Sequence, residues 1–276
     1  MPVIRENLIS CLHLRVARET VVLQNSVTGL IGCGIFHDQT AASAVQMAAL
    51  RARDYPLRGP LAYLRFSLSY RDVEELLMER ALLADHTTIW RWVQRYAPEL
   101  NKRCRRELKP TNGSWRVDET YICQSGSWRC LYRAVDSSGA TIDFWFSAER
   151  DALAAKRFFQ KALQAPGHPR PRVITVDGNP SYQKVIAELK QERKLGRRCR
   201  CRTCPYLNNV VEQDHRGIKR RVNASQGFRS FDGAWRTIQG CEILHMIRKG
   251  QVRWLPKGDV LGQIQFIREI LGLKAE

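Results

Sequence analysis

The sequence predicts an α/β fold in which a mixed sheet is flanked by helices and is preceded by a smaller all-α segment. Three strand-like runs, rich in β-branched and aromatic residues, follow one another over 115–146. Beyond them, segments with the 3.6-residue spacing of amphipathic helices alternate with a short apolar run. This order of elements is typical of a mixed sheet with helices packed on it.

The three runs lie at 115–123, 128–135 and 140–146. Two short polar segments separate them, Gln124-Ser-Gly-Ser127 and Asp136-Ser-Ser-Gly139. Glycine, serine and aspartate favour tight turns, because glycine accepts positive φ and the short polar side chains bond to nearby backbone. The runs are therefore predicted to form an antiparallel meander.

Helices and one more strand follow the meander. Asp151 is placed to cap a helix whose buried stripe ends before Pro166-Gly167. Residues 173–176 form a short apolar strand that leads directly into Asp177, and another helix comes next. After a basic loop, a further helix is expected over 208–222. The complete order is that of a ribonuclease-H-like fold.

Two short helices are predicted ahead of the sheet. The first starts at Ser69, has acids in its first turn and ends near Leu83. The second covers 87–96, with apolar residues at helical spacing, and Pro98 is expected to close it. Two helices joined by a tight turn form a candidate helix-turn-helix.

The second of these helices carries the residues expected to contact DNA. Thr87 and Thr88 open it, and Arg91, Gln94 and Arg95 are placed on its outer face. Arginine and glutamine side chains suit phosphates and base edges, which favours a recognition helix. A plain helical hairpin that packs against the next domain is the alternative.

The expected domain organisation follows from these elements and from a basic, polar connection that ends in Pro110-Thr-Asn-Gly113. The proposed parts are a poorly determined arm at 1–55, a helix-turn-helix domain at 56–101, a linker at 102–113, a ribonuclease-H-like domain at 114–250 and a helical C-terminal extension at 251–276.

The charge of the chain indicates a polyanionic partner. Its 45 Lys and Arg exceed its 27 Asp and Glu, which gives a net charge of +18. Between Lys190 and Arg221 there are 11 basic residues and 3 acids. Such a dense basic segment favours DNA or RNA. An anionic membrane is disfavoured because the segment lacks the apolar face of an interfacial helix.

The apolar run at 21–36 is too polar and too short for a membrane span, and the first residues do not form a convincing signal peptide. A cytoplasmic protein is therefore expected. The 9 cysteines lack a disulfide framework, which indicates a reducing compartment. Cys199, Cys201 and Cys204 crowd together, and a zinc site there would need a fourth ligand such as His215 or Cys241.

The segment Asn208–Val222 contains two acids, followed by a cluster of basic residues. On a helix, Glu212, His215, Arg216 and Lys219 share one face. An acid beside cations suits a metal site that also holds phosphate. A solvated helix with ordinary i, i+4 ion pairs is the alternative.

Three carboxylates can meet at one edge of the expected sheet: Asp118 within the first strand, Asp177 directly after a later strand, and Glu212 on the last helix. Mutual repulsion of these acids is offset if they hold two divalent cations about 3.5–4 Å apart. Hard oxygen ligands favour Mg²⁺ or Mn²⁺. Spacing alone does not choose between Asp118 and Glu119, and it leaves other acids open: Asp136, Asp143 and Asp214.

Several segments in order resemble the DDE transposases of the bacterial IS-six family of insertion sequences. They are SYRDVEELLMER, HTTIWRWVQRYAPE, WRVDETYI, LYRAVDSSGATIDF, YLNNVVEQDH and IRKGQ. Asp177 and Glu212 are separated by 34 residues, and Lys219 follows seven residues after Glu212, which is similar to the DDE pattern of transposases and retroviral integrases. The resemblance extends from about Leu61 to the C-terminus.

The resemblance implies a transposase that binds the terminal inverted repeats of its element through the helix-turn-helix. It also implies that Asp118, Asp177 and Glu212 hold two Mg²⁺ ions, with Mn²⁺ as a substitute, to expose 3′-hydroxyls and join them to target DNA in cointegrates. Basic side chains of the last helix would hold DNA phosphates: Arg216, Lys219 and Arg220.

Two double-stranded DNA partners are implied, the terminal repeats and the target. Since two element ends must meet, a homodimer or higher oligomer is expected. The stripe of Trp235, Ile238, Cys241 and Leu244 fits either an interface or an intramolecular core. Two other functions remain open, a ribonuclease-H-like nuclease and a catalytically inactive DNA-binding remnant or repressor.

Overall fold

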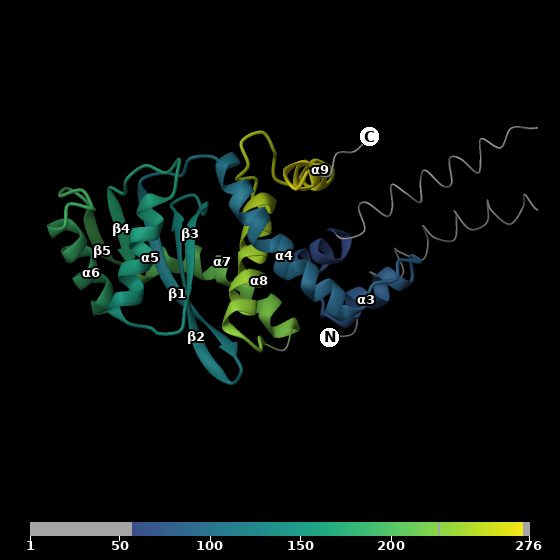
Figure 1. The fold of residues 1–276 in the computed structure, drawn as a ribbon. Coiled ribbons are helices and arrows are strands. Elements are labelled where there is room, and N and C mark those ends of the chain that lie inside the picture. The colour runs from purple at the N-terminus through teal and green to yellow at the C-terminus, as the bar shows by residue number, and fades with distance from the viewer. Residues whose placement is uncertain (1–56, 226, 273–276) are drawn as a thin grey trace, which may run out of the picture. The chain divides into compact units, whose positions relative to one another are not determined.

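The computed structural model describes residues 57–225 and 227–272, all of which belong to one compact unit. The expected arm at 1–55 lies outside the described residues. A first helix covers 57–65. The later elements, in chain order (Figure 1), are α3 (Tyr70–Met78), α4 (His86–Cys104), η1 (Arg105–Glu107), β1 (Ser114–Gln124), β2 (Ser127–Asp136), β3 (Thr141–Ser147), α5 (Ala152–Gln164), β4 (Val173–Val176), α6 (Pro180–Gln191), β5 (Arg200–Thr203), α7 (Pro205–Ala224), α8 (Phe231–Arg248) and α9 (Val260–Ile270).

The sheet has the strand order β3-β2-β1-β4-β5. β1, β2 and β3 pair antiparallel, whereas β4 pairs parallel with β1 and β5 pairs parallel with β4. The predicted meander, helix, strand and helix are therefore confirmed, and the order is that of a ribonuclease-H-like sheet. β5 was not predicted, since it lies inside the basic loop and its four residues are exposed.

The two turns of the meander have clear local causes. Ser125 and Gly126 both have positive φ, 49° and 76°, which closes the two-residue connection between β1 and β2. In the next turn, one carboxylate oxygen of Asp136 accepts hydrogen bonds from the backbone N–H of Ser138 and of Ala140, both at 2.9 Å. Gly139 then supplies the positive φ of 85° that the turn requires.

Alternation along β1 gives the sheet two apolar faces. Trp115 and Val117 pack in one core with the residues of α5 and α6, including Phe158 and Phe159. Ile122 packs in a second core with α4, α7 and α8. Figure 1 shows these two groups of helices on opposite sides of the sheet. Burying each large apolar side chain contributes about 1.5–3 kcal/mol, so both layers hold the sheet in place.

The helical pair in front of the sheet forms, with two corrections. Ser69 begins α3 through a capping box with Asp72, as its position predicts. α3 ends at Met78, earlier than expected, and the connection to α4 is correspondingly longer. The expectation that Pro98 closes the second helix is wrong, because α4 continues to Cys104.

Packing against α8 explains why α4 continues beyond Pro98, a residue that would otherwise be expected to end the helix. Ala97, Leu100 and Cys104 are buried on the face of α4 that joins the second core. The approach is close: a Cβ on Gly240 of α8 would lie 2.6 Å from the Cβ of Ala97. This tight contact offsets the hydrogen bond that Pro98 removes from the helix.

The first part of the expected linker is helical, in the end of α4 and in η1. Beyond η1, Leu108 forms a β-bridge with Val252, and the backbone N–H of Lys109 donates to the carbonyl of Gln251. These contacts tie residues 105–109 to the C-terminal part of the chain. The domain boundaries themselves stay a prediction.

Within the expected C-terminal extension, the structure has one helix, α9 at Val260–Ile270. In the α8 stripe, Ile238, Cys241 and Leu244 are buried in the second core, and Trp235 packs against its edge. The stripe is therefore intramolecular core in this structure. Within the described residues, no helix is long and apolar enough to cross a membrane.

Candidate active site

The sheet brings two of the predicted acids together. β1 and β4 are parallel neighbours, and the last pair of their register, Arg116 with Thr175, lies two residues before Asp118 and Asp177. Both acids are half-buried. A carboxylate oxygen of Asp177 accepts a hydrogen bond from the backbone N–H of Asn179 at 3.1 Å, which holds the turn after β4. The parallel register thus places both carboxylates at one point of the sheet.

A third carboxylate lies in the same place. Oxygen atoms of Asp118, Glu119 and Asp177 all lie within 4.8 Å of one another. No other group of at least three potential metal ligands occurs among the described parts of the chain. Such a cluster of hard oxygen donors has the chemistry that Mg²⁺ and Mn²⁺ prefer.

Glu119 differs from Asp118 in its partners. Its side chain is almost fully buried, where it forms an ion pair with Arg150, with an Nε–Oε1 distance of 2.6 Å, and accepts a hydrogen bond from Tyr182. Burial and this carboxylate raise the pKa of Tyr182, so the phenol donates as a neutral group. The charge of Glu119 is thus already balanced within the protein, which leaves Asp118 as the acid of β1 with more capacity for a cation.

Helix α7 approaches β1 beside Asp118. The side-chain amide of the buried Asn208 donates to the carbonyl of Val117 at 3.2 Å. Two turns later, Nε2 of His215 lies 3.5 Å from an oxygen of Asp118, which is too long for a well-formed hydrogen bond. Burial lowers the pKa of His215, although Asp118 opposes this shift. These two contacts fix the ridge of α7 that faces β1.

Glu212 lies on that ridge, four residues after Asn208 and three before His215. Its side chain is exposed, and its carboxylate does not belong to the group of three acids. The structure therefore brings Asp118 and Asp177 together and places Glu212 on the helix beside them, without bringing its oxygens as close.

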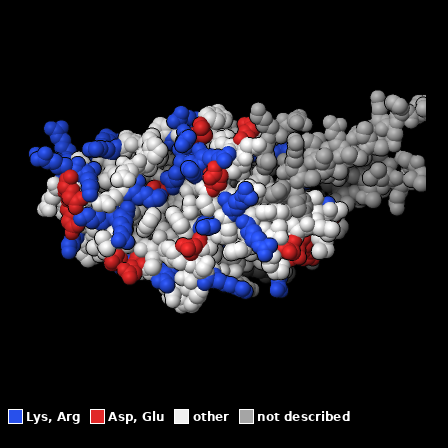
Figure 2. All heavy atoms as spheres, in the orientation of Figure 1, with Lys and Arg blue, Asp and Glu red and all other residues white. Residues whose placement is uncertain are grey.

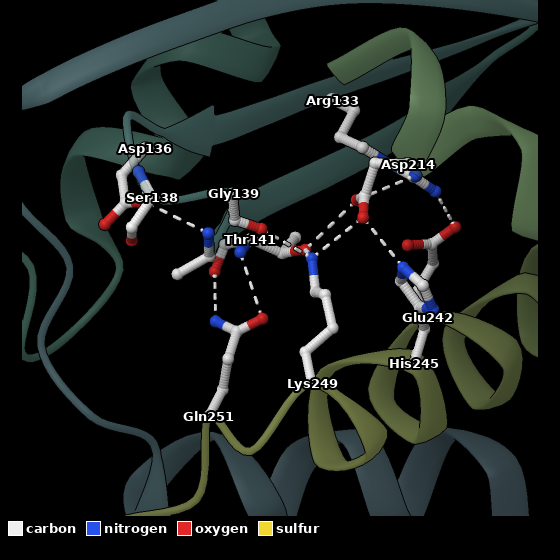
Figure 3. A network of polar contacts seen from close by, with 11 residues as sticks. Arg133, Asp136, Ser138, Gly139, Thr141, Asp214, Glu242, His245, Lys249 and Gln251 are labelled. Carbon is white, nitrogen blue, oxygen red and sulfur yellow. Dashed lines mark hydrogen bonds and ion pairs between the residues drawn. The ribbon is translucent and has the colours of Figure 1, made fainter. Parts of the chain in front are cut away.

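Asp214, two residues further on, has the opposite environment (Figure 3). Its buried carboxylate accepts hydrogen bonds from Arg133 of β2 at 2.9 Å, from His245 at 2.7 Å and from Lys249 at 2.9 Å. Thr141 of β3 lies at 3.3 Å. Burial alone would raise the pKa of Asp214, but these hydrogen bonds and cations hold it well below its usual value.

The network around Asp214 ties α7 to the sheet and to α8. Arg133 also forms a buried ion pair with Glu242 of α8, so its guanidinium bridges two acids. Removing one partner of a buried pair typically costs about 3–5 kcal/mol, because a charge is then left unpaired. No local sequence pattern indicates this role for Asp214, because its partners come from β2, β3 and α8 and from the residue that follows α8.

The basic residues predicted on α7 are on its surface. Arg216, Lys219 and Arg220 are all exposed. Arg220 donates from Nε to the carbonyl of Arg216 at 3.3 Å, and neither guanidinium forms an ion pair with a described residue. Figure 2 shows that lysine and arginine side chains cover more of the visible face than acidic ones do. The exposed face of α7 is suited to phosphates because Arg216, Lys219 and Arg220 lie on it.

On α4, the predicted DNA-contacting residues divide into two groups. Thr87, Arg91 and Arg95 are exposed, and the half-buried Thr88 donates its backbone N–H to the capping Asp85 at 2.6 Å. The placement of Gln94 on the outer face is wrong.

Gln94 is only 8% exposed, and its amide donates to Thr237 of α8 at 3.0 Å. It lies on the α8 side because positions 93, 94 and 97 all fall on the packed face of α4. A side chain held in this way is a packing contact rather than a base reader.

The clustered cysteines occupy different environments. Cys199 is buried, Cys201 is exposed on the edge strand β5, and Cys204 directly precedes α7. Burial raises the pKa of Cys199, and also that of the core residue Cys241, to about 11. These thiols are therefore protonated at neutral pH. Over 57–225 and 227–272 they do not form a group that could hold a metal.

Comparison with known proteins extends these observations. Residues 112–251 match the model of the DDE domain of IS240-type transposases. The chain is 42% identical over 193 residues to the transposase of the insertion sequence-like element IS431mec from Staphylococcus aureus, which covers 70% of this chain and 84% of that protein. It is 41% identical, with the same coverage, to the transposase of IS257 in transposon Tn4003 of Staphylococcus aureus.

Among solved structures, the catalytic core domain of BIV integrase is 19% identical, with a TM-score of 0.38, over 59% of this chain and 99% of that one. The strand order described above, rather than this low score, defines the fold. Fold, acids and family match together define a polynucleotidyl transferase of the DDE type. The chain belongs to the DDE transposases of the IS-six family of insertion sequences.

Proposed function

We propose that this transposase binds the terminal inverted repeats of its element, nicks the 3′ ends and joins them to target DNA, with cointegrates as the product. Asp118, Asp177 and Glu212 are the proposed catalytic residues. The observation that carries the proposal is the parallel register of β1 and β4, which juxtaposes two of these acids, together with the contact of Asn208 that holds α7 against β1.

The acids present fit a divalent metal centre. Asp118 and Asp177 supply oxygen donors within 4.8 Å of each other, and their mutual repulsion favours a cation between them. We assign Glu212 as the third ligand, reached by its exposed side chain from the ridge of α7. Two Mg²⁺ ions, or Mn²⁺ in their place, would supply activation of the attacking hydroxyl and stabilisation of the leaving oxygen.

The residues around the acids have separate tasks. His215 lies beside Asp118 and, with the low pKa that burial gives it, adds no positive charge that would compete with a metal. Arg216, Lys219 and Arg220 hold DNA phosphates close to carboxylates that would otherwise repel them.

Recognition of the terminal repeat is assigned to the exposed side of α4. Arg91 and Arg95 lie one turn apart on this surface, and Thr87 lies at its N-terminal end. Arginine pairs bidentately with guanine edges in the major groove, whereas threonine binds phosphates. Double-stranded DNA is thus the proposed partner, and joining two ends requires at least a dimer in the active complex.

The test is a supercoiled plasmid that carries the element's terminal repeats, incubated with Mg²⁺ and the full chain. Wild type is expected to nick at the 3′ ends and to form joined products, and Asp177→Asn is expected to do neither. Glu188→Gln on α6, which removes an acid that pairs with Lys156 of α5 and lies outside the acidic group, is the matched control. Nicks without joined products would identify a nuclease, and identical behaviour of wild type and Asp177→Asn would overturn the proposal.

A further inference from the structure

A polar cavity of about 250 Å³ lies between the helix at 57–65, α7 and α8. Its lining is rich in cations: Arg65, Arg133, Arg220, Arg221, His245 and Arg248. Among the residues that the structure describes, Glu242 is the single acid that lines it. A water occupies about 30 Å³ in the liquid, so the cavity has room for a phosphate group and several waters.

The single acid does not balance these cations. Glu242 is already paired with Arg133 at the floor of the cavity. Arg65 and Arg248, at its rim, form no ion pair with any residue that the structure describes. Arg65 donates to the neutral amide of Gln263 at 3.4 Å, and Arg248 donates to the carbonyl of Arg65 at 3.4 Å. The rim therefore has uncompensated positive charge.

The two rim arginines also act on each other. Burial lowers the pKa of Arg65, and the neighbouring Arg248 guanidinium lowers it further. Two like charges that interact in this way repel one another, and an anion between them relieves the repulsion. The arrangement is thus more favourable with a ligand of negative charge than without one.

Arg221 adds a fixed charge from inside. It is 5% exposed, its Nη1 donates to the carbonyls of Phe66 and Leu68, and its guanidinium lies 4.0 Å from the ring centre of Tyr63. Its Nε and Nη2 have no hydrogen-bond partner in the structure. Leaving buried donors unpaired is unfavourable, and this is expected of a site that binds a ligand.

We propose that this cavity binds a backbone phosphate of DNA, held by Arg65, Arg220 and Arg248. The choice of DNA rests on the proposed function and on continuity: Arg220 lines the cavity and also belongs to the exposed basic ridge of α7 with Arg216 and Lys219. Gly217 leaves the α7 wall open, since a Cβ there would meet nothing closer than His245 at 3.7 Å.

The first test measures the salt dependence of binding to a short duplex of arbitrary sequence, without metal. The double variant Arg65→Gln, Arg248→Gln is expected to bind more weakly. The plot of the logarithm of the binding constant against the logarithm of the salt concentration has a negative slope, and its magnitude should decrease by about 1, the value for one lost phosphate contact. Arg157→Gln on α5, across the sheet, removes an equal charge per substitution and should leave the slope unchanged. An unaltered slope in the double variant would overturn the proposal.

The second test uses a matched pair at the α7 wall. Gly217→Glu places a carboxylate in the cavity, whereas Gly217→Gln places a neutral group of the same shape, and both residues favour a helix more than glycine does. DNA affinity should be at least tenfold lower for Gly217→Glu than for Gly217→Gln. Equal affinities would contradict a phosphate in the cavity, even if the double arginine variant proves unstable.

Inorganic phosphate alone separates the two sources of the anion. If it raises the melting temperature of the wild type but not of the double variant, and the DNA salt slopes are equal, the cavity binds free phosphate and the DNA proposal is wrong. Failure of the proposed function is distinguishable, because it would appear as an absence of Mg²⁺-dependent nicking while the metal-free slopes still differ.

Discussion

Glu212 and Asp214 lie two residues apart on α7, yet their surroundings differ completely. The carboxylate of Glu212 is exposed and makes no ion pair or hydrogen bond with any described side chain. Asp214 is buried and has four donors, Arg133, Thr141, His245 and Lys249. The carboxylate oxygens of Glu212 are therefore available to a ligand, whereas those of Asp214 already bind groups of the protein.

The same distinction separates Asp118 from Glu119 on β1. Both lie close to Asp177, but Glu119 is held by Arg150 and Tyr182 and Asp118 has only a long contact with His215. A carboxylate that is already paired within the protein binds a metal weakly, since its partners would first have to be displaced. The number of protein partners, rather than position in the sequence, therefore separates the acids that we propose as catalytic from those with a structural role.

The largest expected effect is on the chemistry. Asp118→Asn should reduce 3′-end nicking by roughly a thousandfold, because loss of a metal ligand removes about 4 kcal/mol of transition-state stabilisation. Its free energy of unfolding should fall little, since the side chain has no strong protein partner. Plasmid nicking and urea unfolding of one preparation check both expectations.

Asp214→Asn should show the reverse pattern, with stability as the primary loss. Removing the charge leaves Arg133 and Lys249 buried with a weaker partner, which is expected to lower the free energy of unfolding by about 3–5 kcal/mol. Denaturant unfolding measures this loss. A variant as stable as the wild type would show that the network does not hold α7.

Glu119→Gln sharpens the comparison on β1. The amide keeps the hydrogen bond with Tyr182 but loses the charge opposite Arg150, so a stability loss of about 1.5–3 kcal/mol is expected. Nicking should stay within about tenfold of wild type, far above that of Asp118→Asn. Equal losses of nicking in the two variants would place Glu119 among the metal ligands.

A smaller contrast is expected on α4. Arg91→Ala should weaken binding to the terminal repeat by about 1–3 kcal/mol without a change in stability. Gln94→Ala should lower the free energy of unfolding by about 1 kcal/mol, since it removes the hydrogen bond to Thr237, and should leave repeat specificity intact. Fluorescence anisotropy with repeat and scrambled duplexes distinguishes the two.

The first four strands and the antiparallel meander were predictable, because turn residues and short apolar runs mark them in the sequence. β5 was not, since Arg200–Thr203 has no apolar pattern and is defined only by pairing with β4. The continuation of α4 beyond Pro98 could not be predicted either, because it depends on packing against α8, which lies more than a hundred residues later. Tertiary packing overrides the local signal in both cases.

The sequence predicts that several acids lie near one another, but it does not indicate which of them are paired within the protein and which are free to bind a metal. Arg133 and Asp214 are separated by 81 residues, and Lys249 lies 35 residues beyond Asp214. No local pattern connects such partners. The distinction between Asp118 and Glu119 likewise depends on Arg150 and Tyr182, which reach β1 from other elements.

The most direct measurement of the central claim is the yield of joined products from a terminal-repeat plasmid in Mg²⁺ with Glu212→Gln. The account predicts no joined product, with a melting temperature equal to that of wild type, because the exposed carboxylate of Glu212 acts only through a metal. Joined product at the wild-type yield would contradict the assignment of Glu212 as the third ligand.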